Sequence, residues 1–263
     1  MKERREDLGA SPRISAADAI NGIGAGRAAS PLCSYRTATV AEIVNHAVGG
    51  EWNLPGFQRG FIWKSWQIRD IADSLWRDYP VGPLLLWRNY NPAEPRVRFW
   101  IADGQHRVAA LCVIFGLTPA WWREERKPAR AGAATECELM FDVGAQSPPY
   151  FIAKSDDSAK SRAALVPVRD LLRLNLDSDP DRRELAAIAE RLRRSGVAAA
   201  VPDVYGRLAR LSLIREKPVS IVMLAHHSEE DILEVFRRQI GGGIRFRREL
   251  LRMVATRLRR LRF

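Results

Sequence analysis

The sequence FWIADGQHRVAALCVIF occupies residues 99–115 and combines a strand, a tight polar turn and the start of a helix. Its first four residues have the composition of a strand, and the apolar residues from Val108 onward fit the buried face of a helix. Gly104 stands at the junction, where a residue without a side chain lets the backbone approach an anion closely. The first N–H groups of the helix lack partners within it, and the helix dipole favours negative charge there. The segment therefore predicts a phosphate-binding turn, to which Arg107 adds a forked cation and His106 a titratable donor.

A plainer interpretation of the same turn stays open. In it, Asp103 caps the helix, Gly104 makes the turn, and His106 and Arg107 are solvated side chains. Short polar turns of this kind are common before helices. The blocks of sequence that precede the turn bear on the choice between the two interpretations.

Three blocks lie upstream of the turn. They are PGFQRGFIW at residues 55–63, a helix over residues 65–77 that carries Gln67, Asp70 and Ser74, and YPVG at residues 79–82, which leads into an apolar strand. Together with DGQHR, they resemble the N-terminal domain of the GmrSD family of modification-dependent restriction systems, best over residues 38–115. The family pattern runs P-x-F-Q-R-x-[YF]-x-W, a helix with Gln and D-S, [YF]-P-[IV]-G, a strand, and D-G-Q-Q-R-x-x-A-L. The resemblance implies a fold similar to ParB and sulfiredoxin, nucleotide binding or hydrolysis, and a role in restricting foreign DNA.

Two positions depart from the family pattern. His106 replaces the second glutamine of the turn, which makes the loop more similar to its ParB and sulfiredoxin version and leaves the phosphate-binding chemistry intact. Ile240 stands where the C-terminal pattern F-x-R-x-N-x-x-G has asparagine. Because an aliphatic side chain neither donates nor accepts hydrogen bonds, the role of that asparagine does not transfer to this chain.

The resemblance also implies site residues and a ligand, a nucleoside triphosphate with or without Mg²⁺. The residues expected to hold the nucleotide are Gln58, Arg59, Gly104, Gln105 and Arg107. The residues expected to take part in hydrolysis are Asp103, His106 and Arg107, with Asp103 orienting water and His106 replacing the family glutamine. No metal-ligand cluster is predicted. The hypothesis requires that the Arg107 guanidinium is not sealed in an internal ion pair.

Composition is consistent with a globular protein. The chain has 263 residues, of which 46% are hydrophobic, which suffices for one core and a smaller subdomain. No apolar run reaches the length of a membrane span, and the charged N-terminus lacks the apolar core of a signal peptide, so a cytoplasmic location is expected. The three cysteines, Cys33, Cys112 and Cys137, have neither metal-ligand nor disulfide spacing and are expected to be reduced and mostly buried.

The net charge of +11 favours a polyanionic partner, and the excess is concentrated at the C-terminus. Residues 245–263 contain eight arginines and one acidic residue, Glu249, with apolar residues at near-helical spacing. The arginines chosen as candidate contacts to nucleic-acid phosphates are Arg247, Arg248, Arg252 and Arg259. The alternative, a solvated arginine face on a docked helix, stays open.

The predicted fold class is mixed α/β, a ParB/sulfiredoxin-like mixed-sheet domain followed by a helical subdomain. Residues 1–35 are expected to be disordered or loosely attached, residues 36–160 to form the nucleotide-binding domain, and residues 161–263 to be mostly helical with a basic C-terminal helix. The expected elements are a helix from Thr39 to Gly49, strands at 138–143, 150–152 and 218–223, a helical region that opens at residues 166–170, helices at 181–194 and 204–214, and a helix capped by Ser228 and Asp231. The aromatic residues of the upstream blocks, Phe57, Phe61, Trp63 and Trp66, are expected in the core.

Two functions from different classes follow. The first is a nucleotide-binding, NTP-hydrolysing component of a restriction or phage-defence system. It would lack its own HNH nuclease domain, because no ββα unit follows the late histidines His226 and His227. DNA is the expected partner, with a separately encoded nuclease subunit and oligomerisation as further options. The second is a non-catalytic, ParB-like DNA-binding or regulatory module in which the turn at residues 103–107 is purely structural.

Overall fold

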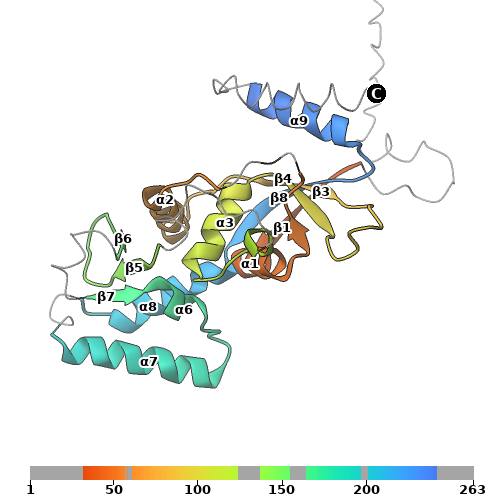
Figure 1. Cartoon of the computed structure of the whole chain (residues 1–263). Helices are drawn as coiled ribbons and strands as arrows, with labels where there is room; N and C mark the ends of the chain where they lie inside the picture. The colour runs from red at the N-terminus through yellow and green to blue at the C-terminus, as the bar shows by residue number, and fades with distance from the viewer. Residues whose placement is uncertain are drawn as a thin grey trace, which may run out of the picture. The chain divides into compact units, whose positions relative to one another are not determined.

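A mixed five-stranded sheet holds the strand–turn–helix segment (Figure 1). The computed structural model describes residues 32–56, 58, 61–123, 137–154, 164–196 and 201–241. In sheet order, the strands are β1 (Cys33–Thr39), β8 (Pro218–Leu224), β3 (Leu84–Arg88), β4 (Phe99–Asp103) and β2 (Trp52–Asn53). The pairs β1–β8 and β3–β4 are antiparallel, whereas β3–β8 and β2–β4 are parallel. The predicted mixed α/β fold class is therefore confirmed.

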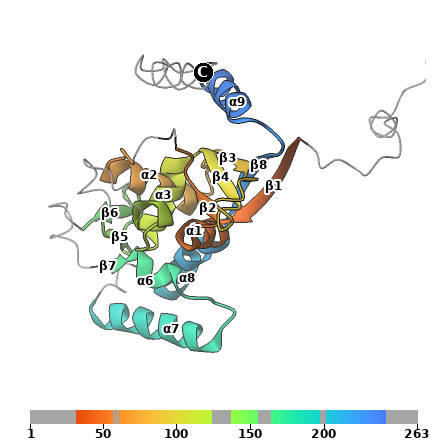
Figure 2. The ribbon, with the colours of Figure 1, turned by 45° about the vertical axis from the view of Figure 1, so that its right-hand side comes forward.

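Helices pack on both faces of this sheet, which Figures 1 and 2 show from two directions. The main core lies between the sheet and the helices α1 (Val40–Gly49), α2 (Ser65–Trp76), α3 (Gln105–Ile114) and α4 (Ala120–Arg123). The helix α9 (Glu229–Gly241) covers the other face, where Ile232 packs with Leu85, Ala102 and Leu224. Alternation along β3 explains the two clusters, because Leu84 and Leu86 point to the main core and Leu85 points to α9.

The start and end of α1 agree with the sequence prediction. Thr39 is the N-cap, its hydroxyl accepts from the Glu42 N–H at 3.2 Å, and the Glu42 carboxylate accepts from the Thr39 N–H at 2.7 Å. Gly50 ends the helix with φ of +81°, a conformation that favours glycine. This reciprocal pair of bonds is a capping box, and it fixes where β1 passes into α1.

A second, three-stranded sheet lies beyond the main one, with the order β6-β5-β7. Its strands are β5 (Leu139–Asp142), β6 (Phe151–Ala153) and β7 (Leu165–Pro167), and the helices that follow are α6 (Val168–Leu172), α7 (Asp179–Arg194), α8 (Val204–Ser212) and the 3₁₀ turn η3 (Leu213–Glu216). The strands β5 and β6 and the helices α7 and α8 match the expected elements. The strand β7 was missed, because Val166 and Pro167 were assigned to a helix start, whereas their backbone pairs with β5.

Two strands fall at or across the predicted segment boundaries. The strand β8 comes from the part of the chain assigned to the helical subdomain, yet it pairs with β1 on one side and β3 on the other. The strand β1 starts at Cys33, within the segment expected to be disordered or loosely attached. The division of the chain at residues 35 and 160 otherwise stays a prediction. Cys112 and Cys137 are buried and Cys33 is exposed, in agreement with the expectation that the three cysteines are mostly buried. Within the described residues, no helix is long and apolar enough to cross a membrane.

Candidate functional site

The turn between β4 and α3 depends on Gly104. This residue is the N-cap of α3 and has φ of +94°, in the left-handed region. A Cβ at this position would lie 2.4 Å from Leu84 Cδ2 and 3.2 Å from Arg107 Nη2. Both conformation and space therefore require glycine. Asp103 does not cap the helix as the plainer interpretation expected, because α3 has no side-chain cap bond.

Arg107 links the turn to the loop that precedes β3. Its Nη1 donates to the Pro83 carbonyl at 2.7 Å and to the Val81 carbonyl at 3.3 Å, and its Nη2 donates to Asp103 Oδ2 at 3.1 Å. Gly82 makes room for the guanidinium, since a Cβ there would lie 2.7 Å from Nη1. Burial lowers the pKa of Arg107, because desolvation outweighs the attraction of Asp103. The YPVG and DGQHR blocks are thus joined through one side chain.

An internal ion pair such as that with Asp103 argues against nucleotide binding by Arg107 if it makes the guanidinium inaccessible. It does not seal the guanidinium, however, because 19% of the Arg107 side chain and 44% of the Asp103 side chain are exposed. A guanidinium has five N–H donors, and within the described part of the chain these three bonds leave two of them without an acceptor. Arg107 therefore retains capacity to bind a further anion.

Arg107 forms part of the wall of a hollow of about 300 Å³, which we call the α2 pocket. The pocket is lined by Trp63, Trp66, Gln67, Asp70, Ile71, Ser74, Pro80, Val81 and Arg107. Trp66, Asp70 and Ser74 are four residues apart on α2 and so share one face of the helix. All four sequence blocks that carry the family resemblance contribute residues to this one hollow.

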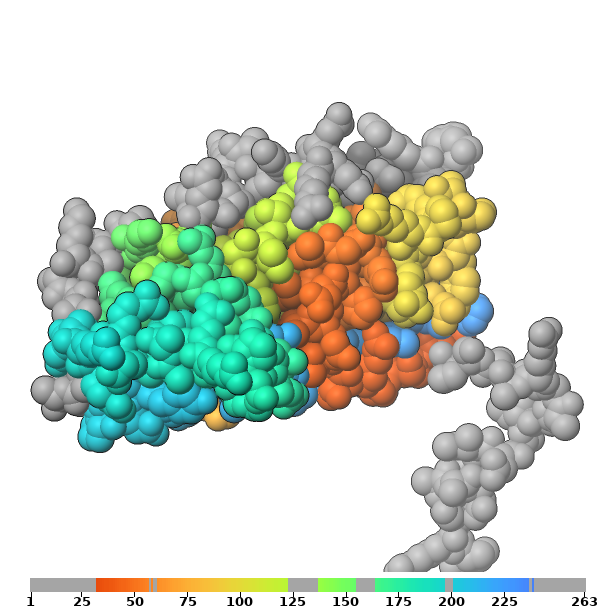
Figure 3. Space-filling view, turned by 90° about the horizontal axis from the view of Figure 1, so that it is seen from below, coloured from red at the N-terminus to blue at the C-terminus, as the bar shows by residue number. Residues whose placement is uncertain are grey.

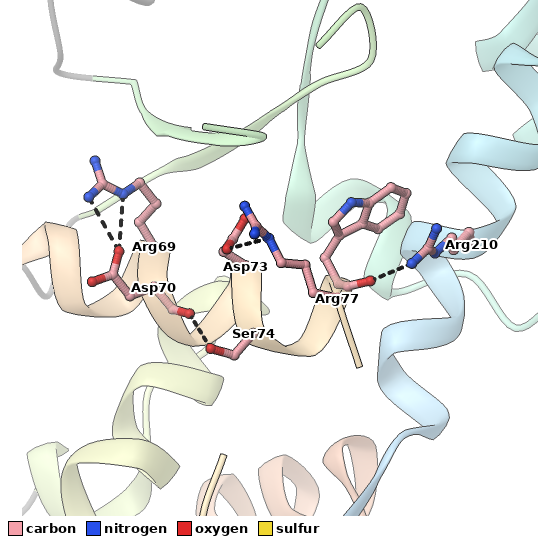
Figure 4. Close-up of polar contacts among 7 residues, drawn as sticks. Arg69, Asp70, Asp73, Ser74, Arg77 and Arg210 are labelled. Carbon is pink, nitrogen blue, oxygen red and sulfur yellow. Dashed lines mark hydrogen bonds and ion pairs between the residues drawn. The ribbon is translucent and has the colours of Figure 1, made fainter. Parts of the chain in front are cut away.

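The polar residues of α2 are partly engaged with one another (Figure 4). The Asp70 carboxylate pairs with Arg69 at 3.3 Å, and the Ser74 hydroxyl donates to the Asp70 carbonyl at 2.8 Å. On the next turn, Asp73 pairs with Arg77 at 2.9 Å. The Asp70 side chain is 54% exposed, so its carboxylate is available to a ligand in the α2 pocket.

The other predicted site residues lie around the turn rather than in the pocket. Gln58 Nε2 donates to the Ala102 carbonyl at 2.7 Å and so holds the upstream loop against the end of β4. The His106 ring lies 5.6 Å from the ring of Phe61 and 5.9 Å from that of Trp63. Gly104 and Gln105 are buried. Of the predicted residues, Arg107 alone is among the described residues that line the pocket.

Several predicted residues lie outside the described residues. They are Arg59 and the C-terminal arginines Arg247, Arg248, Arg252 and Arg259. The described residues contain no group of three or more His, Cys, Asp or Glu side chains that could hold a metal ion.

Sequence reasoning missed the α2 side of the pocket. Trp66 was expected in the core but is 52% exposed, and no site role was predicted for Gln67, Asp70 or Ser74. The available signal was their spacing, because polar side chains at i, i+4 on a helix that otherwise buries an apolar face lie together on its outer side.

Comparison with known proteins is consistent with this geometry. The family model for the N-terminal domain of the GmrSD restriction endonuclease matches residues 40–245. The chain belongs to this family. Membership in the GmrSD N-terminal domain family implies a component of a restriction or phage-defence system. An uncharacterized protein of Methanocaldococcus jannaschii is 28% identical over a segment that covers 30% of this chain and only 17% of that protein's length.

Proposed function

We propose that this GmrSD-family chain binds a nucleoside triphosphate in the α2 pocket and hydrolyses it as a component of a DNA restriction system. The observation that carries the proposal is the state of Arg107. Its guanidinium lines the pocket, retains two N–H donors within the described part of the chain, and has a lowered pKa because burial is only partly offset by Asp103. A phosphate oxygen at this position would supply a second anionic partner beside Asp103.

The α2 pocket also offers a surface for the nucleobase. Trp66 presents a half-exposed aromatic ring at the pocket, and stacking on such rings is a sequence-tolerant way to hold a base. Asp70 and Gln67 supply polar groups for the edge of the base or the ribose. The volume of about 300 Å³ is at the low end for ligand sites. The pocket therefore fits part of a nucleotide, with the remainder extending into solvent.

Hydrolysis consists of attack by water on the γ-phosphorus, with cleavage of the bond to the β–γ bridging oxygen and release of orthophosphate and the nucleoside diphosphate. Asp103 orients the water through its exposed carboxylate, and Arg107 stabilises the charge on the transferred phosphoryl group. His106, which stands in the position of the family glutamine, helps to position the attacking water. Mg²⁺ commonly binds through one or two carboxylates together with substrate phosphates, and Asp103 and Asp70 would supply these.

Two parts of this function lie beyond the pocket. DNA would be contacted by the C-terminal arginines Arg247, Arg248, Arg252 and Arg259. DNA cleavage would be carried out by a nuclease domain or subunit outside the residues that form the α2 pocket. Both belong to the proposal and need DNA-binding and cleavage assays on the full restriction system.

Calorimetric titration of the full chain with each common nucleoside triphosphate, with and without Mg²⁺, tests the binding step. Phosphate release with and without DNA tests the chemistry. Trp66→Ala should weaken nucleotide affinity roughly tenfold by loss of stacking, and Arg107→Lys should abolish phosphate release because it loses the planar fork. Tyr205→Ala, an exposed aromatic on α8, is the matched control and should change neither. Absence of heat with every nucleotide would overturn the proposal.

One observation favours the second candidate, a non-catalytic DNA-binding or regulatory module. The three bonds of Arg107 to Pro83, Val81 and Asp103 are what a purely structural turn requires. In that case no nucleotide binds, Arg107→Lys affects stability alone, and DNA is retained in a salt-dependent way.

A further inference from the structure

The face of the main sheet opposite α3 carries two tryptophans that α9 leaves partly uncovered. Trp87 on β3 and Trp100 on β4 are directly opposite each other in the antiparallel ladder. Directly opposed side chains lie on the same face, here the face on which Leu85 and Ala102 pack with α9. Both tryptophans are only half-buried, in contrast to Trp52 and Trp121 in the main core. Together they form a contiguous, partly exposed aromatic surface, and such surfaces occur at interaction sites.

These tryptophans line a hollow of about 470 Å³, which we call the sheet-face hollow. One wall is the β3–β4 connection, drawn in yellow in Figure 3 beside the orange segment of α1 and β2. Hydrogen bonds within the connection fix its shape, since Asn89 Nδ2 donates to the carbonyls of Glu94 and Val97 at 3.0 and 2.8 Å. The Asn89 side chain therefore holds the backbone of this wall in place.

The opposite wall comes from the segment between β8 and α9. Trp87 Nε1 donates to the His227 carbonyl at 3.0 Å, which ties this segment to the sheet. His226 has φ of +58°, an uncommon conformation for a residue with a side chain, and its ring stacks on Tyr90 with centroids 4.8 Å apart. Non-glycine residues held in this region of backbone space tend to occur at ligand sites. The stack thus joins this segment to Tyr90, which lines the hollow.

We propose that the sheet-face hollow binds an unpaired nucleobase of a nucleic-acid strand. Aromatic side chains on an open sheet face are a recurrent means of stacking unpaired bases, and Trp87 and Trp100 are placed for it. Tyr90, which is 52% exposed, also lines the hollow, and its ring stacks on that of His226. The net charge of +11 supplies the general attraction for a polyanion.

The distribution of charge around the hollow orients the strand. Glu94 and Glu229 are among the residues that line the hollow, so they repel a phosphate from their side of it, whereas their carboxylates accept N–H bonds from the edge of a base. Arg88 lies at the rim with its guanidinium 5.7 Å from the centre of the Tyr90 ring. The base therefore enters the hollow, and the backbone phosphate remains outside beside Arg88.

This site is separate from the α2 pocket. Within the described residues, the two hollows share no lining residue, and they involve different faces of the main sheet. The proposal does not depend on nucleotide binding or hydrolysis in the α2 pocket. Each can fail without the other.

The test is fluorescence anisotropy of the full chain with a labelled twelve-nucleotide single-stranded DNA, the RNA of the same sequence and the corresponding DNA duplex, at fixed salt concentration. Single strands should bind more tightly than the duplex. Trp100→Leu keeps an apolar side chain but removes the aromatic face, and should weaken single-strand binding roughly tenfold. Trp100→Phe should restore most of the affinity. Tyr90→Ala should give a smaller loss in the same direction.

Tyr205→Ala on α8 is the matched control, and thermal melting of each variant checks that the fold is intact. A merely structural role for Trp100 predicts that the leucine and phenylalanine variants behave alike. Equal affinity for single strands and duplex, combined with no difference between these two variants, would overturn the proposal. Binding of the free nucleoside monophosphates alone, with no gain from a strand, would overturn it too, because the site would then be one for a small molecule.

Discussion

The α2 pocket and the sheet-face hollow are built by different means. In the α2 pocket, the one charged group expected to bind phosphate, Arg107, also holds the YPVG loop and the DGQHR turn together. In the sheet-face hollow, Trp87 and Trp100 project from paired strands, and the backbone ladder between these strands positions them. The ligand-binding group of the α2 pocket is therefore part of the hydrogen-bond network that holds the fold together. The aromatic groups of the sheet-face hollow lie on strands whose pairing does not depend on these side chains.

This difference predicts how far a substitution in each site affects ligand binding without affecting the stability of the fold. Removing a group that serves both purposes leaves its acceptors in the fold without their donor, so the fold loses stability along with the ligand. Removing an aromatic ring from a preformed strand pair changes the ligand surface and leaves the backbone bonds intact. Substitutions in the two sites should therefore differ in how much of their effect appears in the free energy of unfolding.

The largest effect is expected at the glycine beneath Arg107. Gly104→Ala places a Cβ 2.4 Å from Leu84 Cδ2 in a residue with φ of +94°, so both a clash and an unfavourable conformation result. We expect a loss of about 2–5 kcal/mol in the free energy of unfolding. Denaturant titration of the purified variant measures it.

Substitutions at two other glycines distinguish the effect of the clash from that of the unfavourable backbone conformation. Gly196 also has positive φ, +87°, but nothing lies within 4 Å of a Cβ there, so Gly196→Ala should cost only the conformational part, about 1 kcal/mol. Gly49 lies in α1 with open space around it, and Gly49→Ala should be neutral or stabilising by about 0.5 kcal/mol. If Gly104→Ala were no worse than Gly196→Ala, the crowding at the turn would be disproved.

The next largest effect is expected at Arg107, which is proposed to bind the ligand and also links the YPVG loop to the DGQHR turn. Arg107→Ala leaves the Pro83 and Val81 carbonyls and the Asp103 carboxylate without their donor, and should cost about 2 kcal/mol in unfolding free energy. Asp103→Asn keeps an acceptor for Nη2 and should cost less than half of that. Chemical denaturation of both variants gives the comparison, and equal losses would show that the ion pair rather than the carbonyl bonds matters.

Local parts of the fold could be predicted from the sequence, because their signals lie within a few residues of one another. The start and end of α1 and the strand–turn–helix around Gly104 were expected from residue types and spacing, and the structure has both. The insertion of β8 between β1 and β3 could not be derived in this way. It joins segments more than 100 residues apart, and no local pattern encodes which strand pairs with which.

The same distinction holds for the candidate site. Arg107 was expected to be a ligand-binding cation because of its place in the turn, but its bonds to Val81 and Pro83 depend on where the preceding loop lies. Trp66 was assigned to the core because aromatic residues are mostly buried, and only the packing of α2 shows that its ring is half-exposed. The chemical role of a residue can be predicted from the sequence where it depends on residues nearby in the chain. The exposure of a side chain cannot, because it depends on the assembled fold.

A smaller effect on stability is expected at Trp66. Because its side chain is 52% exposed, Trp66→Ala should change the free energy of unfolding by no more than about 0.5 kcal/mol. Trp121→Ala, at a fully buried tryptophan, should cost about 3–5 kcal/mol. Thermal melting with and without nucleotide completes the comparison, since Trp66→Ala should reduce the stabilisation by ligand while leaving the unliganded protein unchanged. A large loss in the unliganded protein would place Trp66 in the core after all.

The smallest effect is local and depends on pH. The start of α9, next to the sheet-face hollow, is held by Ser228 and Asp231. The Ser228 hydroxyl and N–H donate to Asp231 Oδ2 at 2.8 and 3.0 Å, and these bonds lower the pKa of Asp231. A carboxyl whose folded pKa is lowered stabilises the folded state above its unfolded pKa, about 3.9, and this contribution is lost as the pH falls through the folded pKa. The first turn of α9 should therefore fray in acid.

Amide hydrogen exchange measures this fraying, expressed as protection factors so that the intrinsic pH dependence of exchange is removed. Protection in the first turn of α9 should fall between pH 6 and pH 3, whereas the first turn of α2, which contains neither an acidic residue nor a histidine, serves as the internal reference. Ser228→Ala should show low protection at both pH values, because the bonds to Asp231 are absent throughout. If protection in α9 were the same at the two pH values in the unaltered chain, Asp231 would not hold this wall of the hollow, and the sheet itself would have to account for its shape.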